Sequence, residues 1–303
     1  MSLQTPDSHL LRIRHRTHYS YHFPVTFEPH RLVIRPREGH DLRVEELTMT
    51  IEPQATLVWT RDLFGNSIAH AHFQEQASEL VIESDVTLRR FFNPNEPPHL
   101  ATSASPYPLQ YDPLEQGIIT GYLSPVFPEE SASVQRWIGS QPPPGDFPSA
   151  EAYVIAMTRI IQQSIGYQRR EQKGVQSPDT TLSLGTGSCR DVATLLMEAL
   201  RHLGIAARFA SGYLDCPNTR AARGSTHAWT EVYFPRLGWN GFDPTIGEPC
   251  DHRHIVTGTS HHPRGVMPVS GRIFGPGNSF RSLTVGVEFS SPPFGLQQSQ
   301  FQS

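Results

Sequence analysis

The sequence has few cysteines, no long apolar run and no marked excess of charge of either sign. Three of its 303 residues are cysteine, at positions 189, 216 and 250. This number is too small for a disulfide framework and leaves at least one thiol free within the chain. Such cysteine usage is typical of a reducing compartment, and we expect a cytoplasmic protein.

The missing apolar run and the small net charge exclude further classes of protein. No segment approaches the roughly 18 apolar residues of a transmembrane helix, and the N-terminus lacks the apolar core of a signal peptide. The formal net charge of -4 gives no electrostatic footprint for nucleic acid or for an anionic membrane. We expect neither as a partner, and the oligomeric state is left open.

The first half of the chain has the pattern of a β-domain. Apolar residues alternate with period two in several short runs, as at Leu47, Met49 and Ile51, which predicts an antiparallel β-sandwich-like domain. The segment DLFGN at 62–66 is expected at a hairpin tip. The expected segments are a flexible N-terminus at 1–9, the β-rich domain at 10–92, a proline-rich linker at 93–113, a second domain at 114–289 and a disordered tail at 290–303.

The second domain carries helices followed by strands, so the fold class is α+β with an antiparallel sheet. Ser149 is a natural N-cap for one helix. A glycine-rich loop at 185–188 leads into another helix, whose apolar stripe includes Cys189 and which stops at Gly204. The remaining expected elements are a helix near 129–138 and strands over 205–214, 225–234 and 238–245.

The position of Cys189 suits a nucleophile. A thiol attacks as its thiolate, and a helix N-terminus or a cationic neighbour favours that form. The backbone N–H of a residue that opens a helix is also an unpaired donor that could bind a developing oxyanion. A cysteine on an apolar helical stripe is more often a core residue, so the assignment depends on a partner histidine.

His227 and Asp243 are the candidate partners of that cysteine. His227 opens a predicted strand and would act as general base, and Asp243 ends the next strand and would orient the imidazole. Regular pairing of Phe234 with Trp239 would place the side chains of His227 and Asp243 on opposite faces of the sheet. We therefore predict a pairing shifted by an odd number of residues, for example with Glu231 opposite Trp239, produced by a wider loop or a bulge.

These residues resemble the transglutaminase-like superfamily of papain-type cysteine enzymes. The resemblance rests on GSCRD at a helix start, HAW at a strand start and GWNGFDPT on the next strand, and on YSYHFPV, HRLVIRPR and DLFGN in the first half. It covers roughly residues 10–290. It implies a β-domain ahead of a papain-like core, in which the helix bearing the cysteine packs on an antiparallel sheet bearing the histidine and the aspartate.

The resemblance also implies roles for single residues. Cys189 would be the nucleophile, His227 the general base and Asp243 the orienting acid. Bacterial members often have glutamine after the cysteine and serine before the histidine, where this chain has Arg190 and Thr226.

The sequence gives weaker signals for the second oxyanion donor and for the other residues around the nucleophile. Animal transglutaminases use a tryptophan upstream of the cysteine as an oxyanion donor, and the nearest one here, Trp137, lies in a different context. Tyr167 is therefore our candidate for this donor. Ser188 and Trp229 are further candidates for the site wall, with Trp229 expected to pack beside the histidine.

A second group of potential ligand residues follows the last predicted strand of the core. Its spacing fits no standard zinc pattern, so we expect a solvated loop rim and no metal. Cys216 is expected to be a loop thiol without a role. The group consists of Cys250, His252, His254, His261 and His262.

The expected activity is acyl transfer at an amide or peptide bond through a thioester, without a cofactor. If water resolves the thioester, the enzyme is a cysteine protease or amidase; if a lysine amine does so, it is a transglutaminase. We favour hydrolysis because no acidic calcium-loop pattern is visible. The expected substrate is a peptide or protein, with an isopeptide or an amide-linked small molecule as alternatives. A catalytically silent binding module is the alternative from another class.

Overall fold

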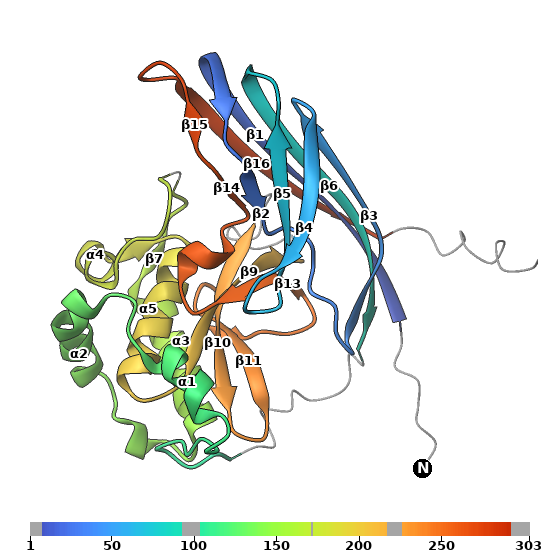
Figure 1. The fold of residues 1–303 in the computed structure, drawn as a ribbon. Helices are drawn as coiled ribbons and strands as arrows, with labels where there is room; N and C mark the ends of the chain where they lie inside the picture. Colours follow the sequence, from blue (N-terminus) through green and yellow to red (C-terminus); the bar gives the residue numbers. More distant parts are fainter. Residues whose placement is uncertain (1–7, 93–103, 171, 217–225, 292–303) are drawn as a thin grey trace, which may run out of the picture.

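The computed structural model describes residues 8–92, 104–170, 172–216 and 226–291. The predicted tail from residue 292 onward, residues 1–7 of the predicted flexible N-terminus and residues 93–103 of the predicted linker lie outside the described residues. Helices lie on one side of a small central sheet, and a larger β-domain lies on the other side (Figure 1). Among the described residues, no helix has the length and apolar character needed to cross a membrane.

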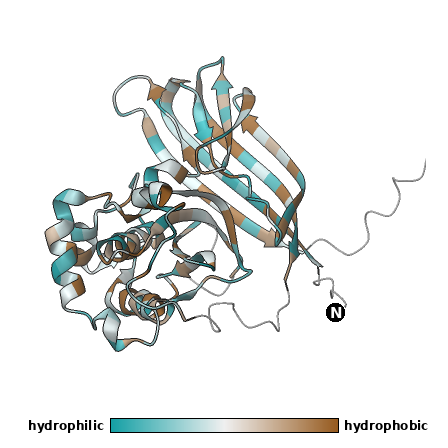
Figure 2. Ribbon diagram, turned by 60° about the horizontal axis from the view of Figure 1, so that its bottom comes forward, coloured by the Kyte–Doolittle hydropathy of each residue, from teal (hydrophilic) through white to brown (hydrophobic). Residues whose placement is uncertain are grey.

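Two antiparallel sheets form the β-domain. Val25 and Phe27 of one sheet pack with Leu32 and Ala69 of the other in a single buried cluster, so the sheets lie face to face. Figure 2 shows the expected alternation of hydrophobic and hydrophilic residues along the long strands. The strands are β1 (Ser8–Phe27), β2 (His30–Leu32), β3 (Leu42–Glu52), β4 (Ala55–Arg61), β5 (Ser67–Phe73) and β6 (Ala77–Phe91).

Strands from the end of the chain return to complete both sheets of this domain. β14 (Val269–Ser270) pairs with β2, whereas β15 (Ile273–Phe274) and β16 (Phe280–Ser290) pair with β1. The sequence pattern had assigned these residues to the second domain. The β-domain is therefore built from segments that lie before and after the core in the sequence.

The core is a five-stranded antiparallel sheet covered by helices, as the sequence predicted. Its strand order is β12-β11-β10-β9-β13, and the side chains of Leu195 and Leu196 on α5 pack with Val232 and Phe234 on β10. The strands are β9 (Ala207–Leu214), β10 (His227–Phe234), β11 (Gly238–Asp243), β12 (Glu248–Pro249) and β13 (His254–Ser260). A short parallel pair joins β7 (Gly166–Tyr167) to β8 (Thr186–Gly187).

Three helices agree with the sequence pattern. Ser149 caps α3 by accepting a hydrogen bond from the backbone N–H of Ala152 at 3.2 Å, and Gly204, with a φ of 71°, follows the end of α5. These helices are α2 (Ser131–Gly139), α3 (Ala150–Ser164) and α5 (Cys189–His202). Two further helices, α1 (Gln116–Leu123) and α4 (Pro178–Leu184), have no counterpart among the predicted elements.

The β-domain docks on the core through a buried interface. Asn66, at the end of the DLFGN segment, is fully buried; its amide donates to the Thr259 carbonyl at 2.8 Å and accepts from the Thr259 N–H at 2.9 Å. Tyr213 on β9 packs with Leu11 and Ile13 of β1. These contacts hold β16 against the core, so that Leu283 and Val285 line a pocket beside Cys189.

Candidate active site

Cys189 is the first residue of α5, and a tight loop delivers it there. Gly185 ends α4 with a φ of 63°, a left-handed conformation that favours glycine. A Cβ at Gly187 would come within 3.0 Å of the Asp191 side chain, so glycine lets the loop approach the helix. The cysteine is 8% exposed, and its backbone N–H has no hydrogen-bond partner among the described residues.

Asp191 holds the first turn of α5 to the loop before it. One carboxylate oxygen accepts the backbone N–H and the hydroxyl of Ser188, at 2.8 and 2.7 Å, and the guanidinium of Arg170 at 2.7 Å. The other oxygen accepts the N–H of Gln176 at 2.7 Å. Burial raises the pKa of this carboxyl, but the Arg170 guanidinium and the other hydrogen bonds lower it below its ordinary value. The aspartate that follows the cysteine therefore has a structural role.

His227 and Asp243 are brought together by the pairing of β10 with β11. Tyr233 pairs with Trp239 and Thr230 pairs with Phe242, which is one residue away from the regular Phe234–Trp239 pairing. The predicted odd shift is therefore present. The example pairing of Glu231 with Trp239, and the bulge or wider loop that it required, are wrong. A three-residue turn at 235–237, with Arg236 at a φ of 73°, produces the shift.

The imidazole of His227 is buried, and one of its two ring nitrogens has a hydrogen-bond partner among the described residues. Its Nε2 lies 2.7 Å from Oδ2 of Asp243, which leaves Nδ1 for the Cys189 side. Burial alone would lower the pKa of the imidazole, but the carboxylate of Asp243 raises it to about 10, and Cys189 adds to the increase. The ring is thus held ready to carry a positive charge next to the thiol.

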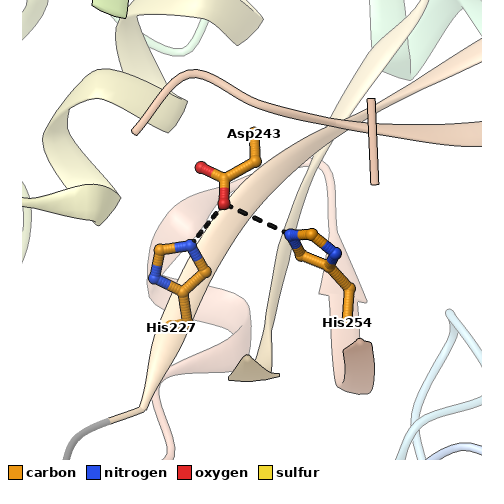
Figure 3. Close-up of side chains that lie close together, drawn as sticks. All are labelled: His227, Asp243 and His254. Carbon is orange, nitrogen blue, oxygen red and sulfur yellow. Dashed lines mark hydrogen bonds and ion pairs between the residues drawn. The ribbon is translucent and has the colours of Figure 1, made fainter. Parts of the chain in front are cut away.

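The carboxylate of Asp243 has a second imidazole partner, which the sequence pattern did not indicate. Nε2 of His254 lies 3.2 Å from the same Oδ2 atom, so one oxygen joins two imidazoles (Figure 3). Oδ1 accepts the backbone N–H of Thr245 at 2.8 Å. Burial raises the pKa of Asp243, but His227 and His254 lower it well below its usual range. The carboxylate is therefore kept ionised inside the protein.

Gly212 is the feature that lets β13 reach this site. It pairs with His227, and a Cβ there would overlap the Ile255 carbonyl and come within 3.0 Å of the Trp229 ring. Trp229 is 1% exposed and packs edge-on against His254, with ring centroids 5.2 Å apart. Trp229 thus packs beside both histidines, and the pocket at Cys189 is lined by other residues.

The group of cysteine and histidine residues after β11 does not form one cluster. The expectation of a solvated rim is wrong for His254, whose side chain is 2% exposed. Cys250 lies beside it, and burial raises the pKa of that thiol to about 11. His252 instead stacks on Phe92, and His261 packs against Phe64.

Three ligand-type atoms of the site could in principle hold a metal ion. The Nε2 atoms of His227 and His254 and a carboxylate oxygen of Asp243 lie within 4.8 Å of one another, the one such group among the described ranges. Both nitrogens already hydrogen-bond the same oxygen, at 2.7 and 3.2 Å. The two Nε2 atoms and Oδ2 are therefore already engaged with one another.

A pocket of about 160 Å³ opens beside the cysteine. The candidate residues Ser188 and Tyr167 both line it, together with Cys189 and His227. Tyr167 is 37% exposed. Burial, followed by the nearby Cys189, raises the pKa of its phenol to about 12, so the hydroxyl keeps its proton as a donor.

Comparison with known proteins supports the resemblance in both halves of the chain. Residues 11–89 match the bacterial transglutaminase-like N-terminal region, and residues 145–244 match the transglutaminase-like superfamily. The predicted resemblance is confirmed in both regions.

Similar proteins come from several bacteria. An uncharacterized protein of Mycobacterium tuberculosis is 28% identical over 298 residues, which cover 90% of each chain. One from Mycobacterium leprae is 30% identical over 105 residues, which cover 33% of this chain and 37% of that one. A crystal structure from Cytophaga hutchinsonii, provisionally described as a cysteine protease, has a TM-score of 0.73 at 18% identity and covers 96% of this chain and 94% of its own. That likeness shows the fold.

Proposed function

Because the chain has a transglutaminase-like core behind a bacterial transglutaminase-like N-terminal region, we propose that it hydrolyses amide or peptide bonds through a thioester on Cys189. One observation carries this proposal. A buried imidazole is bonded to an ionised carboxylate on one side and faces a helix-opening cysteine on the other, beside a pocket. That arrangement activates a thiol and holds the base in one orientation.

The proposed reaction uses these groups in sequence. Nδ1 of His227 accepts the proton of the Cys189 thiol, and the thiolate attacks the amide carbonyl carbon. The backbone N–H of Cys189 donates to the oxyanion, with the Tyr167 hydroxyl as the second donor. The imidazolium gives its proton to the leaving nitrogen, the C–N bond breaks and a thioester remains. Water, deprotonated by the imidazole, then releases the acid and restores the thiol.

Hydrolysis is favoured over transfer to an amine by the charges around the pocket. Arg169 and Arg190 line it beside Arg170, which is paired with Asp191, and none of the described lining residues is acidic. A protonated lysine acceptor would be repelled from such a site, whereas water is not affected. Cys189, Cys216 and Cys250 form no disulfide within the described part of the chain, which fits the cytoplasmic location that we also propose.

The test is turnover of a panel of peptide amides by the wild type and by Cys189→Ala. We expect the wild type to release amine and acid in equal amounts and Cys189→Ala to release neither. Cys216→Ala, which removes a partly buried thiol outside the pocket, is the matched control and should retain full activity. An amide product formed with added lysine would instead indicate a transglutaminase. No turnover by either protein would indicate a silent binding module, and equal turnover by both would reject Cys189 as the nucleophile.

A further inference from the structure

We propose that the pocket at Cys189 continues into a basic cleft with aromatic walls that binds an acyl-donor peptide carrying carboxylate groups. This inference rests on the proposed function, because it concerns the substrate of the same site. Charge, shape and the composition of the walls each support it.

Two hollows lie next to each other at the active site. The pocket of about 160 Å³ at Cys189 shares Arg190, Met267 and Leu283 with a second hollow of about 740 Å³. The second hollow lies between the β-domain and the core, because β1 and β16 form one wall and the loop around Lys173 forms another. A substrate held at the thiol would therefore extend along the cleft between the two domains.

Cationic side chains line this cleft. Arg169 and Arg190 lie at the pocket, and Lys173, Arg264 and Arg272 lie in the larger hollow. The guanidinium of Arg190 donates to backbone carbonyls, and none of the five side chains forms an ion pair within the described part of the chain.

The cleft contrasts with the rest of the molecule in its charge. None of its described lining residues is acidic, although the chain has 29 acidic and 25 basic residues. Another hollow, on the outer face of the β-domain, includes Glu46, Glu83 and Asp85 beside Arg12. The described walls that lead to the thiol are therefore positively charged, and such walls would concentrate anionic ligands.

Aromatic side chains make up the other part of the walls. Tyr19, Tyr21, Phe274 and Phe280 line the larger hollow, and the two phenylalanines are 60% and 51% exposed. Such rings offer apolar contact area to the side chains of a bound peptide. Arginine forks next to them match the planar geometry of carboxylates and can bind them through two parallel hydrogen bonds.

An acidic peptide fits this combination better than a nucleic acid does. The net charge of -4 disfavours general attraction to a phosphate backbone. The basic cleft ends at a site suited to attack on an amide carbonyl. A peptide with glutamate or aspartate near the reacting amide supplies both the charge and the bond.

The first test measures binding without turnover. A fluorescent peptide with glutamates flanking a central glutamine and an aromatic residue is titrated with Cys189→Ala, beside the same peptide with every glutamate replaced by glutamine. We expect the acidic peptide to bind about tenfold more tightly. The difference should shrink between about 0.05 M and about 0.5 M NaCl. Equal affinities, or stronger competition by single-stranded nucleic acid, would overturn the proposal.

The second test localises the charge effect. Arg264→Gln combined with Arg272→Gln in the same protein should remove most of the preference for the acidic peptide and leave the neutral peptide unaffected. Arg281→Gln is the matched control, because this exposed arginine of β16 lies outside both hollows. Selective binding to the cleft without turnover by the wild type would support this inference and reject the proposed function, so the two can fail separately.

Discussion

Asp243 and His227 lie on the same face of the β10–β11 pair, with Oδ2 of the aspartate 2.7 Å from Nε2 of the histidine. Side chains of directly paired residues share a face, and Tyr233 pairs with Trp239. Counting by twos from this pair reaches His227 on one strand and Asp243 on the other. A single residue of register thus decides whether the buried imidazole has a carboxylate partner.

Asp243→Asn should remove most of the activity while leaving the protein folded. The amide keeps the size of the side chain but removes the charge that raises the pKa of the His227 imidazole to about 10. We expect kcat to fall about a thousandfold. Nitrogen-resolved NMR of the imidazole should show its pKa moving far below that of the wild type. An unchanged pKa, or kcat within a few fold of the wild type, would contradict this role.

Stability should depend on pH through the same pair. The pKa of Asp243 is lowered by folding from 3.8, so its contribution is present above that value and is lost as pH falls. The pKa of His227 is raised from 6.5 to about 10, so its contribution is complete below 6.5 and is lost as pH rises towards 10. Urea unfolding should show a larger stability difference between the wild type and Asp243→Asn at about pH 5 than at about pH 9. A difference that does not vary with pH would argue against the coupling.

Local signals in the sequence were sufficient to place Cys189. The glycine loop, the apolar stripe and the stop at Gly204 all lie within one short segment, and the helix begins at the expected residue. The odd shift between β10 and β11 also followed from the alternation of the strands. The cause of the shift could not be predicted, because the sequence does not reveal that Arg236 adopts a positive φ in a three-residue turn.

The contribution of His254 could not be derived in this way. It is close to Asp243 in sequence, but it lies on β13, which is separated from β11 by two other strands in the sheet. Its approach depends on the irregular pairing of β13 with β9 and on the absence of a side chain at Gly212. Neither feature has a periodic pattern. The glycine within an otherwise regular strand was the one available sign of a close backbone approach.

Asn66→Ala should weaken the attachment of the β-domain to the core. The substitution leaves the buried N–H and carbonyl of Thr259 without the amide that bonds both. We expect the free energy of unfolding to fall by about 2 kcal/mol, which thermal melting would detect. Asn240→Ala is the control, because this side chain bonds only the nearby Gly238 carbonyl. Equal melting temperatures for the two variants would show that the buried link contributes little.

His254→Leu should lower kcat without changing KM. His254 does not line the pocket, but its loss leaves Oδ2 of Asp243 with one hydrogen bond instead of two. The aspartate would then hold the His227 ring less firmly, and we expect kcat to fall about tenfold. His254→Gln keeps an N–H donor in reach of the carboxylate and should restore most of the rate, which loss of packing alone would not explain.

The matched control for this substitution is His252→Leu, because His252 stacks on Phe92 and makes no contact with the aspartate. A positioning role for His254 requires the pKa of His227 to shift in His254→Leu and to remain unchanged in His252→Leu. If His254→Leu and His254→Gln lose the same activity while the pKa of His227 stays at its wild-type value, His254 supports only the packing around Trp229. If the glutamine variant recovers both the rate and the pKa, the hydrogen bond to Asp243 is what the reaction needs from β13.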